Sequence, residues 1–209
     1  MKKKLIGLID GQSGNIGSIK KAIKDIIIDK PYRLKVINEN FSIEEFDKII
    51  LPGQGAYSTL VSNLKRLKIY KPLKQYLLNN SSFLGICVGM QILSDKGYED
   101  KVTNGLGIIS GNVKKFKKKN LIVPHMGWNS INIKKNNSVI DQRFNKKDFY
   151  FVHSYIYQNI SKINVLATTY YGKNFPSIIN KGNIYGVQFH PEKSHKYGVS
   201  LIRSFINDK

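Results

Sequence analysis

The sequence predicts a three-layer α/β fold, in which an open and mainly parallel sheet is flanked by helices and gains antiparallel strands in the C-terminal half. In the first half of the 209-residue chain, short apolar runs alternate with segments of helical periodicity, which is typical of βαβ units. In the second half, apolar runs are separated only by turn residues, which indicates antiparallel hairpins added to one edge of the sheet. No stretch rich in Pro, Gly or Ser divides the chain, so we expect a single domain over residues 1–209.

The expected strands of the first half are short apolar runs bounded by turn signals. Such runs are typical of strands buried on both faces of a parallel sheet. One of them, "KIILPG", is stopped by a Pro-Gly pair. These strands are expected at residues 5–10, 33–38, 48–53 and 83–87.

The helices between these strands are predicted from apolar residues at helical spacing. Residues 18–28 form one such pattern, with Ser18 as a possible N-cap. Residues 60–78 form a second pattern, which we expect to break at Pro72. A further helix is expected to begin directly after Cys87, in "VGMQILSD".

The second half ends with a helix after a series of strand-like segments. The segment "YGVSLIRSFIND" is amphipathic, because Val199, Ile202, Phe205 and Ile206 recur at helical spacing. The strand-like segments before it are "GLGIISGNVKKF", "NSINIKK", "FYFVHSYIY", "NVLATTYY" and "SIINKGNIYGVQFH".

The chain is strongly basic, with a net charge of +20. Its Lys and Arg residues are scattered along the whole sequence, and the one dense run is "KKFKKK" at residues 114–119. We therefore interpret the charge as a solvated, lysine-rich surface and expect no nucleic-acid partner. An acidic partner protein or a phosphorylated substrate is the main alternative, and a nucleic-acid footprint is the weaker one.

Cysteine usage and hydropathy favour a cytoplasmic protein. A single cysteine cannot form an internal disulfide, which fits a reducing compartment. The opening "MKKKLIGLID" begins like a signal peptide, but its apolar stretch stops at Asp10. No apolar run approaches the ~18 residues of a membrane span, so we expect no membrane association.

The single cysteine, Cys87, lies between two glycines in "GICVG". This is the cysteine form of G-x-nucleophile-x-G, in which the nucleophile sits on a strained turn from a strand to a helix. Side chains at Gly85 and Gly89 would collide with the neighbouring strand and helix. Such a turn exposes the sulfur at the carboxyl end of the sheet, where the helix N-terminus favours the thiolate. The alternative is a small buried apolar residue, since free cysteine is among the most buried residue types.

A thiolate nucleophile needs a histidine base, and the histidine needs an orienting group. His190 follows the strand-like "IYGVQF", and Glu192 lies two residues further on. Pro191 fixes the backbone between them, which helps to direct the two side chains toward one another. A carboxylate on the far ring nitrogen holds the useful tautomer and stabilises the imidazolium.

Acyl transfer also needs donors directed at the developing oxyanion. The amide of Val88, directly after the nucleophile, is one natural donor. The segment "LPGQGAY" offers another, because Gly53 and Gly55 would let the Gln54 peptide turn its N–H toward the site. The alternative for this segment is a plain Pro-Gly turn.

Taken in this order and spacing, "PGQGAY", "FLGICVGMQIL" and "YGVQFHPEKS" resemble the class I (triad) glutamine amidotransferases. The segments "LIDGQSGNIGSI", "VPHMGWN" and "FYFVHSYIY" narrow the resemblance to the glutaminase subunits of imidazole glycerol phosphate synthases. The motifs run from residue 5 to about residue 206, so the likeness covers essentially the whole chain.

The resemblance implies a role for each member of a catalytic triad. Cys87 would attack the side-chain amide of L-glutamine and form a glutamyl thioester. His190 would carry the proton to the leaving ammonia and then activate water, and Glu192 would orient His190. The resemblance implies no cofactor and no metal.

The resemblance also implies residues around the triad. The oxyanion environment would come from Gly53, Gln54 and Val88. The substrate-binding positions that match are Gln91, Ser154 and Tyr155, with Glu99 as a weaker match for the substrate amino group. Gln91 could instead be a polar helix residue, and Ser154 and Tyr155 plain strand residues.

In this family the ammonia passes to a partner subunit. The implied partner is a (β/α)8 synthase or cyclase subunit, bound as a heterodimer, which forms imidazole glycerol phosphate and an aminoimidazole carboxamide ribotide in histidine biosynthesis. The resemblance puts Asn15, Trp128 and Lys193 near that interface. Trp128 could instead be a core residue, and Lys193 solvated surface.

The sequence departs from the family pattern at several positions outside the triad. "DGQSGN" stands where a Tyr-Gly pair usually follows the aspartate, Gln54 stands where valine is usual, and Val88 where leucine is usual. "SDKGYED" replaces a more acidic segment. These departures leave open a paralogue that feeds ammonia to another acceptor, chiefly in the amidination of surface sugars. A non-catalytic regulatory domain and another cysteine hydrolase of similar fold are weaker alternatives.

Overall fold

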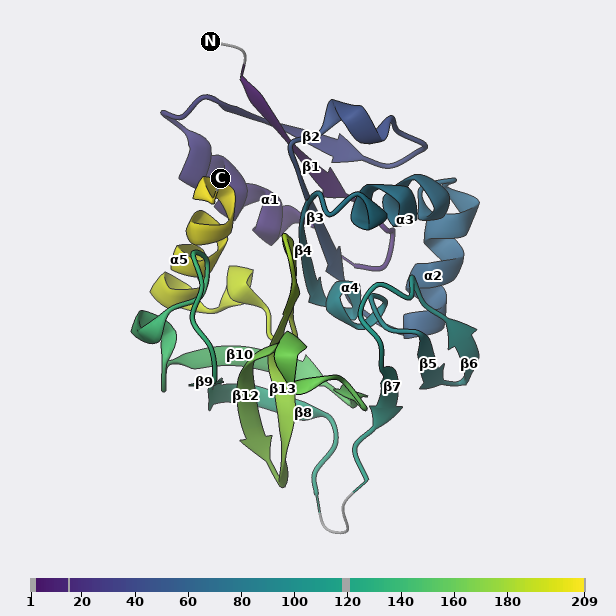
Figure 1. The fold of residues 1–209 in the computed structure, drawn as a ribbon, viewed down its shortest axis with the longest axis vertical. Coiled ribbons are helices and arrows are strands. Elements are labelled where there is room, and N and C mark those ends of the chain that lie inside the picture. Colours follow the sequence, from purple (N-terminus) through teal and green to yellow (C-terminus); the bar gives the residue numbers. More distant parts are fainter. Residues whose placement is uncertain (1–2, 15, 118–120, 209) are drawn as a thin grey trace.

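The computed structural model describes residues 3–14, 16–117 and 121–208 of the chain. Its centre is an eight-stranded sheet in the order β2-β1-β3-β4-β14-β13-β12-β9 (Figure 1). The first five strands in this order pair in parallel and the rest antiparallel. The parallel strands are β1 (Lys4–Ile9), β2 (Tyr32–Ile37), β3 (Lys48–Gly53), β4 (Ser82–Cys87) and β14 (Ile184–Val187). The antiparallel ones are β13 (Lys173–Lys181), β12 (Val165–Tyr171) and β9 (Asn132–Ile133).

Helices cover both faces of this sheet, as the right-handed crossover rule requires. The chain moves one way along the sheet from β1 to β2 and the other way from β3 to β4, so the connecting helices fall on opposite faces. Figure 1 shows α1 and α5 on one side of the strands and α2 and α3 on the other. The helices are α1 (Gly17–Ile27), α2 (Tyr57–Arg66), α3 (Tyr70–Leu78), α4 (Val88–Gln91) and α5 (His195–Asn207). The predicted three-layer, mainly parallel fold is confirmed.

Two smaller sheets lie beside the central one, and the sequence did not predict them as separate. One pairs β8 (His125–Ser130) with β10 (Asp148–His153). The other has the order β11-β7-β5-β6. Its strands are β5 (Lys96–Glu99), β6 (Lys101–Asn104), β7 (Asn112–Lys115) and β11 (Tyr155–Gln158). The expected strand "FYFVHSYIY" is therefore split at Ser154 between two sheets.

Two local expectations were wrong. Ser18 does not cap α1, because the N-cap position is Ile16 and no side chain caps the helix. The break in the second helical pattern lies before Pro72, where Lys68 adopts a φ of 58°. Pro72 sits in the first turn of α3, where a missing N–H costs nothing.

The helix after Cys87 is also much shorter than the sequence indicated. The N–H groups of Leu93 and Ser94 bond to carbonyls three residues earlier, which tightens and ends α4. The chain then forms the β5–β6 hairpin. Four short 3-10 helices complete the described chain: η1 (Ile43–Glu45), η2 (Gln142–Phe144), η3 (Lys162–Asn164) and η4 (Pro191–Lys193).

The apolar faces of the helices pack against the central sheet. Ile19, Ile23 and Ile26 of α1 are buried, which follows their helical spacing. On α5, Ile202 and Phe205 are buried as expected, whereas Val199 is only partly buried. Within the described ranges, no helix is both long enough and apolar enough to cross a membrane.

Candidate active site

Cys87 occupies the turn between β4 and α4, as its flanking glycines indicated. Its backbone has φ 54° and ψ −110°, a conformation that L-residues rarely adopt. A Cβ on Gly85 would lie 2.5 Å from the carbonyl oxygen of Gly89, and a Cβ on Gly89 would lie 2.0 Å from that of Leu51. Both glycines are therefore required by close backbone approach, and the predicted strand-to-helix turn is present.

His190 lies next to the sulfur and is paired with Glu192 on its other side. His190 Nδ1 is 2.8 Å from Glu192 Oε1, and both side chains are almost completely buried. Burial lowers the pKa of His190, but the charge of Cys87 and hydrogen bonds to Cys87 and Glu192 outweigh this effect and raise the pKa to about 10. An imidazolium beside a cysteine stabilises the thiolate form, which is the form in which a cysteine attacks a carbonyl carbon.

A cavity of about 520 Å³ opens above these residues and collects most of the predicted site. It is lined by residues from both halves of the chain. Among the predicted residues, its lining includes Gln54, Cys87, Val88, Gln91, Glu99, Ser154, Tyr155, His190 and Lys193. Glu192 lies behind His190, and Gly53 lies beside Cys87, with which it pairs across β3 and β4. Asn15 lies outside the described residues.

Two polar side chains on the cavity wall can orient a bound amino acid. Gln91 donates from Nε2 to the backbone oxygen of Tyr155, at 3.0 Å, which leaves its carbonyl oxygen as an acceptor. Glu99 accepts the backbone N–H of Tyr57 at the start of α2, at 2.8 Å. Burial raises the pKa of Glu99, so the carboxylate gains from an additional cationic partner.

The Gln54 peptide is not directed at the cavity in this structure. Its N–H donates to the carbonyl oxygen of Ser13, at 3.2 Å. Rotation of this peptide changes ψ of Gly53 and φ of Gln54, and a glycine at residue 53 gives the backbone the freedom that such a rotation needs. Val88, as the first residue of α4, has a backbone N–H without an acceptor inside the helix. In this structure the N–H of Gln54 is therefore bonded to Ser13, whereas the N–H of Val88 has no acceptor within α4.

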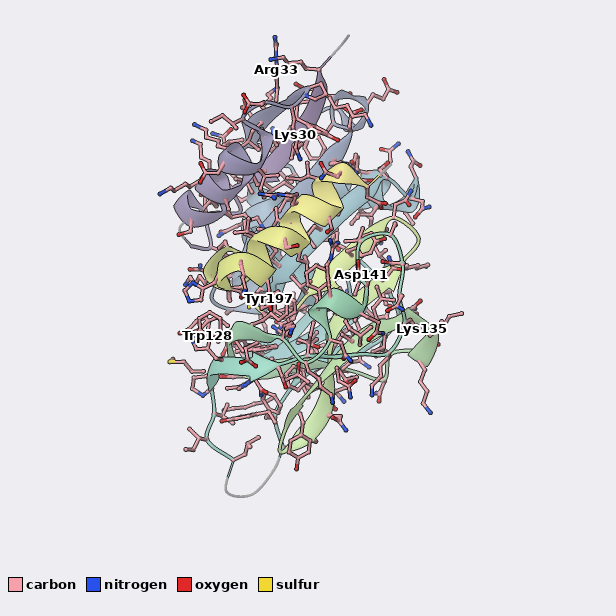
Figure 2. The ribbon with its side chains drawn as sticks, turned by 90° about the vertical axis from the view of Figure 1, so that its left-hand side faces the viewer. Lys30, Arg33, Trp128, Lys135, Asp141 and Tyr197 are labelled. Atoms are coloured by element: carbon pink, nitrogen blue, oxygen red, sulfur yellow. The ribbon has the colours of Figure 1, made fainter. Side chains whose placement is uncertain are left out.

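The strand β8 presents apolar side chains outward, beside the mouth of the cavity. Met126 is 62% exposed and Trp128 is 48% exposed, and they share one face of the strand. The indole of Trp128 stacks on the ring of His195 with centroids 4.8 Å apart, and its exposed position is visible in Figure 2. The alternative that Trp128 is a core residue is wrong. Lys193 is exposed at the rim of the cavity.

One residue that contacts the sulfur was not predicted from the sequence. Gln188 is completely buried, and its Nε2 lies 3.7 Å from Cys87 Sγ. A signal was available, because residues 188 and 190 are two apart at a strand end and so project to the same side. The buried pair of His125 and His153, with ring nitrogens 3.1 Å apart, was also missed. Within the described part of the chain, no group of three or more His, Cys, Asp or Glu residues is placed to hold a metal ion.

Comparison of the sequence with known proteins identifies a family model and several relatives that match nearly the whole chain. The family model described as "Glutamine amidotransferase class-I" matches residues 13–208. An imidazole glycerol phosphate synthase subunit HisH from Methanocaldococcus jannaschii is 44% identical over 204 residues, covering 97% of this chain and 98% of that protein. A protein of the same name from Pelagibacter ubique is 40% identical over 206 residues, covering 97% and 99%.

Structural comparison supports the fold independently. A glutamine amidotransferase from Thermotoga maritima superposes with a TM-score of 0.74 at 15% identity, over 99% of this chain and 97% of that one. A chain in the structure of PurLQS from the same organism gives a TM-score of 0.73 at 18% identity, over 98% of both chains. At these identities the likeness concerns the fold alone.

Proposed function

The chain belongs to the class I glutamine amidotransferase family, and from this premise we propose that it is the glutaminase subunit of an imidazole glycerol phosphate synthase. Relatives of about 40% identity over nearly their full length carry the name of that subunit. In this proposal the chain hydrolyses L-glutamine to glutamate and ammonia. The ammonia then passes to a (β/α)8 partner subunit, bound as a heterodimer, which uses it to form imidazole glycerol phosphate.

In the proposed reaction, the thiolate of Cys87 attacks the side-chain carbonyl carbon of glutamine. The imidazolium of His190 gives its proton to the leaving nitrogen, so ammonia departs and a glutamyl thioester remains. Neutral His190 then takes a proton from the water that attacks the thioester, so glutamate leaves and the thiolate of Cys87 and the imidazolium of His190 are restored. Glu192, bonded to the other ring nitrogen of His190, stabilises the imidazolium in both steps.

The remaining predicted residues have supporting roles in the proposal. The carbonyl oxygen of Gln91, the carboxylate of Glu99 and the backbone around Ser154 and Tyr155 would hold the amino acid end of glutamine. The N–H of Val88 would bind the oxyanion. The N–H of Gln54 would join it after leaving the carbonyl of Ser13.

The proposed partner surface lies on β8 and at the mouth of the cavity. Exposed Met126 and Trp128 supply the apolar area, and Lys193 supplies a charge at the rim. Asn15 belongs to the same proposal on the resemblance alone. We also propose that residues 1–209 act as one domain and that the protein is cytoplasmic, where the thiol of Cys87 stays reduced.

The observation that carries the proposal is the buried Cys87–His190–Glu192 arrangement on the wall of one cavity. The test is copurification with the (β/α)8 subunit, followed by assays with each acceptor. Glutamate and imidazole glycerol phosphate should form in equal amounts, and an electrophilic glutamine analogue should label Cys87.

A matched variant makes the test sharper. Cys87→Ala should abolish glutamine-dependent synthesis but keep synthesis from added ammonium, because only the nucleophile is lost. Glutamate formation that supports a sugar acceptor and not imidazole glycerol phosphate would establish the paralogue alternative. Absence of labelling in the presence of the partner would refute the nucleophile.

A further inference from the structure

Gln188 directly follows β14, and its side chain is completely buried between the proposed nucleophile and Gln91. Its Oε1 is 3.0 Å from Gln91 Nε2, and its Nε2 is 3.7 Å from Cys87 Sγ. Burying an amide is unfavourable unless its polar groups are bonded, and here one of its partners is a sulfur atom. The position of Gln188 therefore calls for a reason beyond packing.

The direction of these hydrogen bonds is fixed by a backbone carbonyl. The oxygen of Tyr155 can only accept, so Gln91 must face it with its NH₂ group. The same NH₂ group faces Gln188, which must therefore present its carbonyl oxygen to Gln91. The NH₂ group of Gln188 is then left facing Cys87.

The carbonyl of Tyr155 is itself held in place from a second side. His153 lies with Nδ1 2.9 Å from this oxygen, and its Nε2 is paired with Nδ1 of His125. A ring nitrogen that faces a carbonyl must carry the proton, so Nδ1 of His153 is a donor. The series of hydrogen bonds that ends at the sulfur therefore begins at His153, whose side chain is buried.

We infer that Gln188 is a positioning residue for the nucleophile, donating its amide N–H to the Cys87 thiolate and favouring this form over the thiol. A thiolate is a much stronger acceptor than a thiol, so the bond is worth more in the charged state. The same bond restrains the sulfur on the wall of the cavity. The inference rests on the proposed role of Cys87 and extends it.

Other titratable groups surround the sulfur, and the test must leave them unchanged. They come from the segment after β14, from β10 and from β5. They are His190 with Glu192 behind it, His153, Glu99 and Lys193. Substitutions at Gln188 alter none of these residues.

The test is the pH profile of Cys87 alkylation by iodoacetamide in the full-length protein. Gln188→Met keeps the length of the side chain but cannot donate. The pH midpoint of alkylation in this variant should be about 0.5 to 1 pH unit higher than in the wild type. Below the midpoint its alkylation should be about 3- to 10-fold slower than that of the wild type, and above the midpoint the two rates should be equal. Gln188→Glu places a negative charge beside the sulfur and should move the midpoint further.

A nearby core substitution provides the control. Ser177 lies on β13, its carbonyl accepts the N–H of Gln188, and its hydroxyl has no partner among the described residues. Ser177→Ala should keep the wild-type midpoint. A wild-type midpoint in well-folded Gln188→Met and Gln188→Glu proteins would overturn the inference.

A measurement on the wild type covers the case in which the variants do not fold. The side-chain ¹⁵N and ¹H resonances of Gln188 should shift as Cys87 ionises, and a constant shift across that titration would contradict the bond. Neither experiment needs glutamine or the partner subunit. A shifted midpoint without glutaminase activity would therefore retain this inference while refuting the proposed function.

Discussion

At the scale of single residues, Glu192 is one of the two groups, together with Cys87, that raise the pKa of His190. Its Oε1 bonds His190 Nδ1, whereas its buried Oε2 has no partner among the described residues. A carboxylate with an unsatisfied oxygen at this depth is stabilised chiefly by the imidazolium beside it. The two side chains therefore support each other's charge, and loss of one changes the state of the other.

Glu192→Gln should lower kcat for glutamine hydrolysis by about 10²- to 10⁴-fold with little change in KM. The variant keeps the shape of the side chain but removes the charge that helps to raise the pKa of His190. The measurement is steady-state glutaminase activity in the complex, with the ¹⁵N titration of His190 recorded in parallel. Glu44→Gln, at an exposed acid, is the control and should leave kcat unchanged. Activity within twofold of wild type would contradict the role of Glu192.

The residues of the triad could be predicted because their geometry is largely local. Two glycines define the turn at Cys87, and a single proline, which restricts the backbone, separates His190 from Glu192 in the sequence. The contact between Gln188 and Cys87 spans 101 residues, and the bond of the Gln54 N–H depends on a carbonyl in another loop. Such contacts are determined by tertiary packing, so they cannot be predicted from the periodicity of the sequence.

At the scale of elements, the strand-to-helix turn after β4 is limited by backbone packing. The Cβ position of Gly89 overlaps the carbonyl oxygen of Leu51 on β3, which is a part of the central sheet that has no room to move. The strain at Cys87 is thus maintained by the packing of α4 on two strands. The element positions the nucleophile only while that packing is intact.

Gly89→Ala should lower the free energy of unfolding by about 3 kcal/mol, because either the strand or the helix must shift. The rate of Cys87 alkylation should also change, because the turn that positions the sulfur is displaced. Urea unfolding of the isolated protein measures the first effect. Thr59→Ala on the exposed side of α2 is the control, with an expected change within about 0.5 kcal/mol. A stability equal to wild type would show that the turn tolerates a side chain.

The β8–β10 pair contains a second titratable element, the buried histidines His125 and His153. Burial lowers the pKa of His125 to about 4 and that of His153 to about 3. Both are neutral in the folded protein at pH 5 to 6, whereas unfolded histidines bind protons below about pH 6.5. The unfolded state therefore binds more protons in this window, and stability must fall as the pH is lowered.

We expect the free energy of unfolding to fall by up to about 1.4 kcal/mol per pH unit for each of these histidines below pH 6.5. His190, whose pKa is raised to about 10, is already protonated in the folded state, so between about pH 7.5 and 5.5 it adds a smaller slope of the opposite sign, which vanishes at lower pH. Urea titrations between pH 7 and 5 measure the slope. His125→Gln should reduce it by about half. A flat profile between pH 6.5 and 5 would contradict the neutral buried pair.

The elements of the first half could be predicted closely because each is a local apolar pattern, as with β3 at Lys48–Gly53. The β5–β6 hairpin was missed because its short strands, "KGYE" and "KVTN", have few apolar residues and no alternation. The division of "FYFVHSYIY" between two sheets was missed because pairing partners far along the chain determine it. That division bends the chain at Ser154 and brings residues 153–155 to the cavity.

At the scale of the whole molecule, the two halves of the chain meet at the cavity. β3 and β4 supply the nucleophile turn, and the two small sheets, built mostly from the second half, supply the opposite wall. The sequence could predict that both halves contribute, since its motifs came from both. It could not predict the three-sheet arrangement, since register between distant strands is not visible in one sequence.

The net charge of +20 also belongs to the whole molecule. Basic residues lie at separate parts of the surface, as Figure 2 shows for Lys30 and Arg33 in its upper part and Lys135 lower down at the right edge. A spread of positive charge does not define a binding site. It does produce a long-range field that attracts an acidic partner before contact.

If the partner subunit is acidic, association should slow as salt rises, because ions screen this field beyond about 10 Å at 0.1 M. We expect the association rate constant to fall about tenfold or more between ~50 mM and ~500 mM NaCl, with a much smaller change in dissociation. Stopped-flow mixing of the two subunits, followed by Trp128 fluorescence, measures both rates. The control variant is Trp128→Phe, whose binding is followed by a fluorescent label on the partner subunit. Its smaller apolar contact area should speed dissociation, and the salt dependence of association should stay unchanged. An association rate constant that does not depend on salt would show that the lysines do not attract the partner and serve only as a solvated surface. Electrostatic steering acts over distances that salt screens, so it cannot be present without a salt dependence.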